Sequence, residues 1–403
     1  MSSSRLQQIL ADQHNGSPGN LIVRTMSERG AISAADIARE TGLARSTVST
    51  ALAELKKSGI VVEIQDELRV VKGAGRPATS LTLNPEAGTC VGIHLSIEEI
   101  RLCIADVSHS VIDEQIIQLG PDYLPEAAAS AAKKAMQALY RSNGLSRAGL
   151  LGVGVSVSGP ISPAGRLQRA SILPAWAGIN ITQLFSHALN CQVFTDNESN
   201  CAAIAEMMWG AAVGHDDFVI FKIDLGVGGA VVNNGRVITG IAGGAGEFGH
   251  ISLEGSSALC RCGNRGCLEL SAGFKTPIEQ ASKVHGRPMT MDDVILLAEE
   301  GDIGALRLIS DSGEAASRGL ALICTIINPP LVIIGGRMAL AGGIILEPLK
   351  RAFEKHTMIK SSDVDEVSRT RIVVGKYTEN DSLLGAVGLV LRSHGKLVRR
   401  AGV

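Results

Sequence analysis

GHISLEGSSALCRCGNRGCLE, residues 249–269, gathers three cysteines, one histidine and two glutamates into one short segment. Cys260, Cys262, Cys267 and His250 supply four soft or borderline ligands, which is the number that a tetrahedral zinc site takes. The glycines between the cysteines let the backbone fold around an ion. A closed site of this composition would be structural, because it leaves no open position for a water molecule. The alternative is a redox-active thiol cluster, which the absence of C-x-x-C spacing disfavours.

Two acidic side chains bracket the cysteine segment. Glu247 stands three residues before His250, and Glu269 stands two residues after the last cysteine. The spacing leaves two interpretations open. These groups are solvated surface charges, or a metal-stiffened loop directs two carboxylates and an imidazole toward a polyhydroxylated ligand, since paired acceptors suit vicinal sugar hydroxyls.

The composition is that of an ordinary globular protein. The chain has 403 residues, of which 45% are hydrophobic and 19% charged, enough for a substantial core and for two or three domains. Its 46 glycines fit an α/β protein with many tight connections. A net charge of −2 argues against a surface that coats nucleic acid or membrane as a whole, although it allows a local basic patch.

No segment has the pattern of a signal peptide or an apolar run of about 18 residues, so we expect a cytoplasmic protein with no membrane partner. The eight cysteines are too few for a disulfide scaffold in a chain of this length. The five that stand apart from the segment described above are expected to be reduced core residues.

Residues 33–57 have the pattern of a helix-turn-helix. Ser33 can cap a first helix that ends near residue 39 or 40, and Gly42 permits a tight turn. A second helix then opens at residue 45 or 46. Its apolar positions fall on one face: Val48, Leu52 and Leu55. An earlier helical stretch, residues 20–29, stops at a glycine.

The second helix exposes one arginine and several short polar side chains, which suits entry into the DNA major groove. These expected DNA contacts are Arg45, Ser46, Thr47, Ser49 and Thr50. The following segment, residues 60–71, predicts two short strands around the polar QDE turn, and a glycine-rich basic exit completes a wing. Arg76 in that exit is expected to reach phosphate or the minor groove. The alternative is a protein-protein module, because helix-turn-helix geometry also occurs without DNA.

After about residue 86 the chain alternates short apolar runs with helical stretches, which predicts a mixed α/β domain with buried strands. The expected strands lie within 89–96, 100–107, 150–160, 191–197, 217–229, 230–238, 331–336 and 371–376, and the expected helices within 126–142 and 199–212. Asn234-Gly235 predicts a hairpin. Similar strand-rich stretches near residues 90 and 218 hint at a duplicated, two-lobed architecture.

Five segments carry a resemblance to the ROK family of repressors, open reading frames and sugar kinases: GEFGHISLEG, CRCGNRGCLE, TDNESNCAAIAE, PPLVIIGG and the winged helix-turn-helix ending in GRP. The resemblance covers nearly the whole chain. It implies a two-lobed actin-like and hexokinase-like ATPase fold with ribonuclease-H-like lobes, sugar in the cleft, and zinc held by the histidine and three cysteines. By motif position, the residues expected at the sugar or effector are Asn197, Glu198, Glu247, His250 and Glu269.

The same resemblance raises the question of kinase or repressor, because the family contains both. The kinases carry a phosphate-gripping turn, D-x-G-G-T-K, where this chain has GIHLSIEEI at residues 92–100. There His94 replaces the acid, and two glutamates would repel a triphosphate. The second phosphate loop is kept only in part, as DLGVGG at residues 224–229.

Two further positions depart from the kinase pattern. Glu198 stands where the kinases place an aspartate general base, and its extra methylene displaces the carboxylate by about 1.5 Å, an error that can cost roughly 10²-fold in rate. Ile172 stands where the kinases tend to carry an asparagine, so one sugar hydroxyl loses a partner. Together these changes favour a sensor that keeps the sugar half of the site and has lost the ATP half.

The expected function is therefore that of a sugar-responsive DNA-binding transcriptional regulator, a repressor and not an enzyme. It would have a winged helix-turn-helix domain at residues 1–85 and a ROK domain at residues 86–403, with a zinc-binding loop at 250–267. The expected partners are a double-stranded DNA operator, a sugar or sugar phosphate, and further copies of the chain in a dimer or tetramer. The alternative is an ATP-dependent sugar kinase with an accessory DNA-binding domain. A zinc-stabilised scaffold that binds neither ligand nor DNA would leave the winged helix without a role.

Overall fold

The computed structural model describes residues 5–11, 16–65, 79–168, 173–253 and 257–393. The chain divides into two units, each with its own core. The first contains residues 1–159, 164–196 and 386–403, and the second contains residues 160–163 and 197–385. Among the described residues, no helix is both long and apolar enough to cross a membrane.

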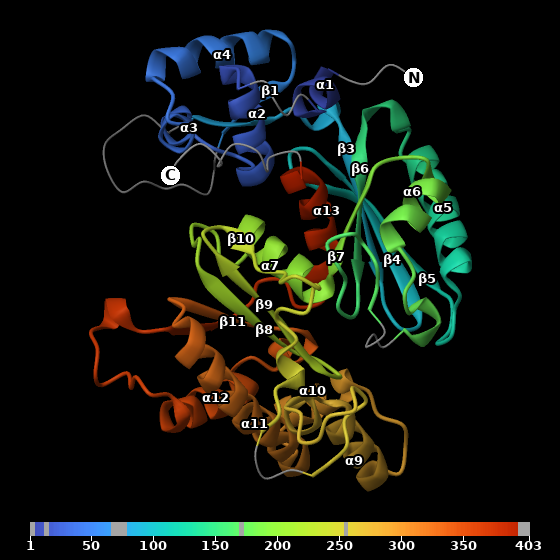
Figure 1. Cartoon of the computed structure of the whole chain (residues 1–403), viewed down its shortest axis with the longest axis vertical. Helices are drawn as coiled ribbons and strands as arrows, with labels where there is room; N and C mark the ends of the chain where they lie inside the picture. Colours follow the sequence, from blue (N-terminus) through green and yellow to red (C-terminus); the bar gives the residue numbers. More distant parts are fainter. Residues whose placement is uncertain (1–4, 12–15, 66–78, 169–172, 254–256, 394–403) are drawn as a thin grey trace. The chain divides into compact units, whose positions relative to one another are not determined.

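The first unit opens with the helix-turn-helix that the sequence predicts (Figure 1). Its helices are α1 (Arg5–Ala11), α2 (Pro18–Arg29), α3 (Ala34–Thr41) and α4 (Arg45–Lys57). The Ser33 hydroxyl caps α3 by accepting a hydrogen bond from the backbone N–H of Asp36, at 3.1 Å. The predicted apolar face of α4 is confirmed, since Val48, Leu52 and Leu55 are all buried.

The strand that pairs with the first wing strand is one that the sequence did not predict. Strand β1 (Val61–Gln65) pairs antiparallel with β2 (Thr79–Leu83), whereas the sequence placed the partner strand directly after the QDE turn. The expected partner lies outside the described residues, as does Arg76. A physical reason favours β2 in this position, because its Leu81 and Leu83 are buried and Leu81 exchanges two 2.9 Å backbone hydrogen bonds with Ile32.

A five-stranded sheet follows in the first unit, with strand order β5-β4-β3-β6-β7. The strands are β3 (Thr89–Leu95), β4 (Glu99–Asp106), β5 (Val111–Gln118), β6 (Leu150–Val157) and β7 (Val193–Asn197). β3 runs antiparallel to β4 and parallel to β6. Helix α5 (Pro125–Ser142) packs against β4 and β5 and also contacts α6 (Ile181–Leu189).

The sheet of the second unit repeats this plan in the order β10-β9-β8-β11-β12, and the predicted duplication is confirmed. The strands are β8 (Phe218–Ile223), β9 (Val227–Asn233), β10 (Arg236–Val237), β11 (Leu331–Gly335) and β12 (Arg371–Val374). β8 runs antiparallel to β9 and parallel to β11. The predicted hairpin joins β9 to β10, where Asn234 and Gly235 both have positive φ, 51° and 67°.

Helices surround the second sheet and carry the candidate site. They are α7 (Glu198–Trp209), α8 (Glu269–Ala272), α9 (Lys275–His285), α10 (Met291–Glu299), α11 (Ile303–Ile327) and α12 (Gly343–His356). α7 packs on β8 and β9, and α8 packs on α11. Helix α13 (Asp381–Ser393) begins in the second unit and ends in the first. The two mixed sheets and the added winged helix match the fold class expected from the sequence.

Candidate functional site

The predicted ligand set comes together in the second unit. His250 ends the short helix η4 (Phe248–His250), and the ligand atoms of His250, Cys260, Cys262 and Cys267 all lie within 4.8 Å of one another. Cys260 Sγ lies 3.6 Å from His250 Nδ1, and Cys262 Sγ lies 3.6 Å from Cys267 Sγ. Metal–sulfur bonds of about 2.3 Å in a tetrahedron place sulfurs about 3.7 Å apart. The four residues could therefore hold a metal ion.

The protonation of these groups also suits a metal. Burial lowers the pKa of His250 even though the charge of Glu269 opposes the effect, so the neutral ring keeps a lone pair for coordination. Burial raises the pKa of Cys262, but hydrogen bonds, first from the backbone N–H of Asn264 and then from Cys260 and Cys267, outweigh burial and hold that pKa below its usual value.

The two predicted glutamates lie beside this cluster. The Nδ1 atom of His250 faces the cysteines, and its Nε2 atom lies 4.0 Å from Glu247 Oε2. Burial raises the pKa of Glu247 to about 7; Arg261 opposes this shift, while the charges of Glu198 and Glu269 add to it. The carboxylates of Glu198, Glu247 and Glu269 are thus close enough for their charges to interact.

Arg261 balances part of that negative charge. Its Nε lies 3.1 Å from Glu269 Oε1. Arg261 was not predicted as a site residue, although its place between two cysteines of the cluster is a usable signal. The loop that brings the cysteines together thereby also orients Glu269.

Asn197 and Glu198 enter the site from the junction of β7 and α7. Asn197 ends the strand and caps the helix, because its Oδ1 accepts a hydrogen bond from the backbone N–H of Ser199 at 2.7 Å. Glu198 is the first residue of α7, close enough for its charge to raise the pKa of Glu247. The structure therefore brings together Glu198, Glu247, His250 and Glu269, with Asn197 next to Glu198 in the chain.

Residues 224–229, expected to be a partly kept phosphate loop, make up the turn after β8 and the first residues of β9. Asp224 accepts hydrogen bonds from the backbone N–H groups of Leu225 at 2.9 Å and Arg337 at 3.2 Å. A Cβ on Gly226 would lie 2.4 Å from Glu269 Oε2. A side chain at position 226 would therefore require the Glu269 carboxylate to move from the position it has here.

The segment expected to replace the first phosphate loop, residues 92–100, forms a tight β-hairpin between β3 and β4 in the first unit. The backbone N–H of Ser96 donates to the carbonyl of Glu99 at 3.1 Å and closes the turn. His94 Nδ1 lies 3.2 Å from Ser156 Oγ on the neighbouring strand β6. Ile172, the other position that departs from the kinase pattern, lies outside the described residues.

The expected DNA contacts lie in the first two turns of α4. Arg45, Ser46, Ser49 and Thr50 are exposed, Thr47 is half-buried, and Val48 between them is buried. The N-cap residue is Ala44, which has no side-chain acceptor, so no side chain caps this end of the helix. The Thr50 hydroxyl donates to the Ser46 carbonyl at 3.1 Å, which leaves it as an acceptor toward a partner.

A buried ion pair near the site was not predicted. Lys222, on β8, lies 2.9 Å from Asp381, and their side chains are 9% and 3% exposed. Burial lowers the pKa of Lys222, but the charges of Asp381, Glu198 and Asp224 outweigh it and raise the pKa above its ordinary value. The ammonium is therefore a permanent charge within reach of Glu198.

Comparisons with known proteins extend over most of the chain. The ROK family model matches residues 90–393, and a model of a winged helix-turn-helix DNA-binding domain matches residues 21–62. The xylose repressor of Bacillus subtilis is 30% identical over 350 residues, covering 86% of this chain and 85% of that protein. The glucokinase of Thermotoga maritima is 30% identical over 253 residues, covering 59% of this chain and 78% of that protein.

The fold has a counterpart among solved structures. A ROK family transcriptional regulator, described as a homologue of the Escherichia coli Mlc protein, superimposes with a TM-score of 0.74 at 20% identity and covers 97% of this chain and 98% of that one. The likeness therefore includes the winged helix as well as both sheets.

Proposed function

Because this chain belongs to the ROK family, we propose that it is a sugar-responsive DNA-binding transcriptional regulator that acts as a repressor. The observation that carries the proposal is the presence, in one chain, of a winged helix-turn-helix with Arg45 exposed at the start of α4 and of a carboxylate cluster beside a His/Cys site. The similarity to a xylose repressor over 86% of the chain supports it. A relative of the kinase class matches a smaller share, 59%.

The metal is proposed to be structural zinc. Three thiols and one imidazole fill a tetrahedron and leave no position for a water molecule. When bound, zinc would fix the loop of residues 250–267. The neighbouring side chains would then bind the effector. Arg261 orients the Glu269 carboxylate, and the Nε2 atom of His250, on the side of Glu247, is available for a hydrogen bond to the effector.

The effector is proposed to be a sugar or sugar phosphate bound by Asn197, Glu198, Glu247, His250 and Glu269. Carboxylates accept hydrogen bonds from hydroxyls, and an adjacent pair suits vicinal hydroxyls. Burial raises the pKa of Glu247 to about 7, although Arg261 opposes the shift, so near neutral pH this carboxyl can either donate or accept. The xylose in the name of the Bacillus subtilis relative makes pentoses the first ligands to test.

Sugar phosphorylation is not proposed as the function. The first phosphate loop is replaced by a closed hairpin with His94 and two glutamates. Gly226 lies close to the Glu269 carboxylate, so its presence alone does not indicate a phosphate-binding turn. Glu198 in place of an aspartate base further argues against efficient phosphoryl transfer.

The chain is proposed to bind operator DNA as a dimer or tetramer in the cytoplasm. Paired winged helices would read a palindromic site, because two-fold protein symmetry is matched by two-fold DNA symmetry. The proposed domain boundary near residue 85 is supported by the short η1 helix (Pro85–Ala87), which separates β2 from β3.

A binding screen and a kinase assay test this function together. A thermal-shift screen of pentoses, hexoses and their phosphates should reveal a ligand that raises the melting temperature with saturation. That ligand should weaken binding to duplexes selected from a random DNA library. An ADP-release assay over the same panel should show no turnover, and a rate above about 1 s⁻¹ would overturn the regulator-only assignment.

A further inference from the structure

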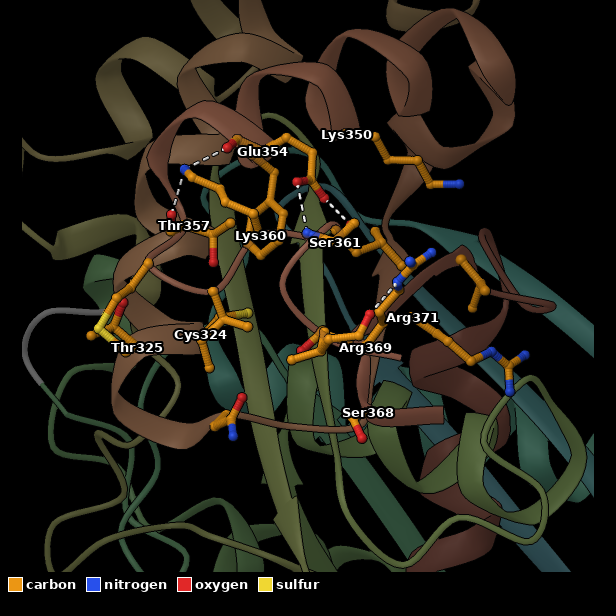
Figure 2. A pocket seen from close by; sticks show the side chains of 18 residues that line it. Cys324, Thr325, Lys350, Glu354, Thr357, Lys360, Ser361, Ser368, Arg369 and Arg371 are labelled. Carbon is orange, nitrogen blue, oxygen red and sulfur yellow. Dashed lines mark hydrogen bonds between the residues drawn. The ribbon is translucent and has the colours of Figure 1, made fainter. Parts of the chain in front are cut away.

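A cavity lies in the second unit, and none of the residues proposed for the effector site lines it (Figure 2). It has a volume of about 500 Å³ and lies between the C-terminal ends of α11 and α12, the loop of residues 357–370, and β12. Small-molecule sites in proteins commonly have volumes of about 300–1,000 Å³. The cavity is therefore of a size that accommodates a metabolite.

The cavity wall is apolar on one part and cationic on another. Cys324, Phe353 and Ile372 are buried and line it. Four cationic side chains also line it, against a single carboxylate, that of Glu354; they are Lys350, Lys360, Arg369 and Arg371. Figure 2 shows Lys350 and Arg371 on the right of the view and Cys324 on the left.

The side chains of Glu354 and Lys360 line the cavity, and both form hydrogen bonds with other residues of its wall. Glu354 accepts hydrogen bonds from both the backbone N–H, at 3.1 Å, and the hydroxyl of Ser361. The Lys360 ammonium donates to the carbonyls of Glu354 and Thr357, each at 2.6 Å, and to that of Lys355 at 3.2 Å. It therefore neutralises the negative end of α12, which would otherwise repel an anion.

The other three cations are open to a ligand. Within the described part of the chain, no carboxylate forms an ion pair with Lys350, Arg369 or Arg371. Arg369 donates a hydrogen bond from Nε to the Val364 carbonyl at 3.3 Å. Its two terminal nitrogens are therefore available as donors to a ligand. The charge of Arg369 also acts on Asp365: hydrogen bonds from Ser368, and then this charge, hold the pKa of Asp365 below its usual value.

We propose that this cavity binds a small organic monophosphate, with the phosphate on Lys350, Arg369 and Arg371 and the organic part against Phe353 and Ile372. Guanidinium groups match phosphate oxygens with paired N–H donors, and a concave wall of one charge raises the local concentration of anions. The site would give the regulator a second input, separate from the carboxylate cluster.

Phenyl phosphate is a suitable probe for calorimetry on the full chain, because it has an apolar body, one phosphate and no vicinal hydroxyls to occupy the carboxylate site. We expect it to bind, phenol not to bind, and inorganic phosphate to bind more weakly. The double variant Lys350→Gln with Arg371→Gln should weaken phenyl phosphate binding by at least about 10-fold. Affinity should also fall as salt rises.

Arg351→Gln is the matched control, since Arg351 lies beside Lys350 on α12, is exposed, and does not line the cavity. It should bind phenyl phosphate within about 2-fold of the parent. The variant Glu247→Gln should also retain this binding, which separates the cavity from the effector site. Circular dichroism and melting temperature confirm that each variant folds. The proposal is overturned if phenyl phosphate fails to bind at millimolar concentration, or if the double variant binds as tightly as Arg351→Gln.

Discussion

The hydroxyl of Ser27 donates a hydrogen bond to the backbone carbonyl of Leu391 over 3.1 Å, joining residues that are 364 positions apart. Ser27 is fully buried in α2, and Leu391 lies in the last turn of α13. The last four carbonyls of a helix have no partner within it. Ser27 therefore satisfies one of these groups and attaches α13 to the winged helix.

The opposite end of α13 contacts the proposed effector site. The Ser382 hydroxyl donates to the backbone carbonyl of Glu198 at 3.2 Å, and Asp381 pairs with Lys222. The first turn of α13 therefore lies beside Glu198. A displacement of Glu198 on effector binding would act directly on the first turn of α13.

Replacing Ser27 tests the attachment of the winged helix. Ser27→Ala leaves the Leu391 carbonyl without its donor in a buried place, so we expect the free energy of unfolding to fall by about 1–3 kcal/mol. Urea denaturation measures the change. Ser49→Ala, on the exposed face of α4, is the control and should change stability by less than about 0.5 kcal/mol. Equal stability of the two variants would show that the hydrogen bond contributes nothing.

His109 predicts a pH dependence at the same place. Its Nε2 donates to the Ser27 carbonyl at 3.0 Å, and burial lowers the pKa of His109 to about 4, against the opposing effects of Ser27 and Asp106. A histidine with a lowered folded-state pKa is stabilising above the unfolded value of about 6.5, and that stability is lost as pH falls toward 4. Between pH 7 and pH 5 we expect a loss of about 1–2 kcal/mol in urea denaturation. His109→Gln should flatten this dependence, and an unchanged slope would contradict the assignment.

Local patterns explain what the sequence predicted. Val48, Leu52 and Leu55 repeat at helical spacing, so the helix and its buried face follow from the chain alone. The three cysteines lie close together in one segment and share one chemistry, so their convergence also needs no long-range information. The same holds for Asn234-Gly235, whose positive φ angles are a local requirement.

The features that the sequence did not predict depend on distant partners or weak patterns. Lys222 and Asp381 are 159 residues apart, and nothing beside either residue marks it as half of a buried pair. Strand β5 was missed because it is an edge strand whose Val111, Ile112 and Ile116 are exposed, so it has no buried stripe to detect. Arg261 and Glu269 meet only because the cysteine loop folds back.

Arg45 is expected to contribute directly to operator recognition. Arg45→Ala should weaken binding by about 1–3 kcal/mol if the guanidinium pairs with a guanine, because this residue is the first of α4, the helix proposed to enter the major groove. Fluorescence anisotropy with a selected duplex measures the loss. Arg141→Ala, exposed at the end of α5, removes the same charge elsewhere and should leave the affinity unchanged. Full affinity and selectivity in Arg45→Ala would remove this residue from the set that reads bases.

Removing only one partner of the buried ion pair between Lys222 and Asp381 should strongly lower the free energy of unfolding. Lys222→Met leaves a carboxylate that is 3% exposed without its counter-charge, and we expect a loss of about 3–5 kcal/mol in urea denaturation at pH 7. Adding Asp381→Asn removes the unpaired charge and should recover at least half of the lost free energy of unfolding. A double variant no more stable than Lys222→Met would mean that packing, and not charge, dominates at this position.

The cysteine loop should control sugar binding without controlling DNA binding. Cys262→Ser removes one of the four proposed metal ligands, so metal and sugar affinity should fall together, because Arg261 then no longer holds Glu269 in place. The winged helix has its own buried core, so operator binding should persist without effector. Glu269→Gln should instead keep the metal and weaken sugar binding by about 1.5–3 kcal/mol. Atomic absorption and calorimetry on both variants separate these effects. If Cys262→Ser lacks metal yet binds sugar as tightly as the parent, the loop stabilises the fold locally and has no part in sensing.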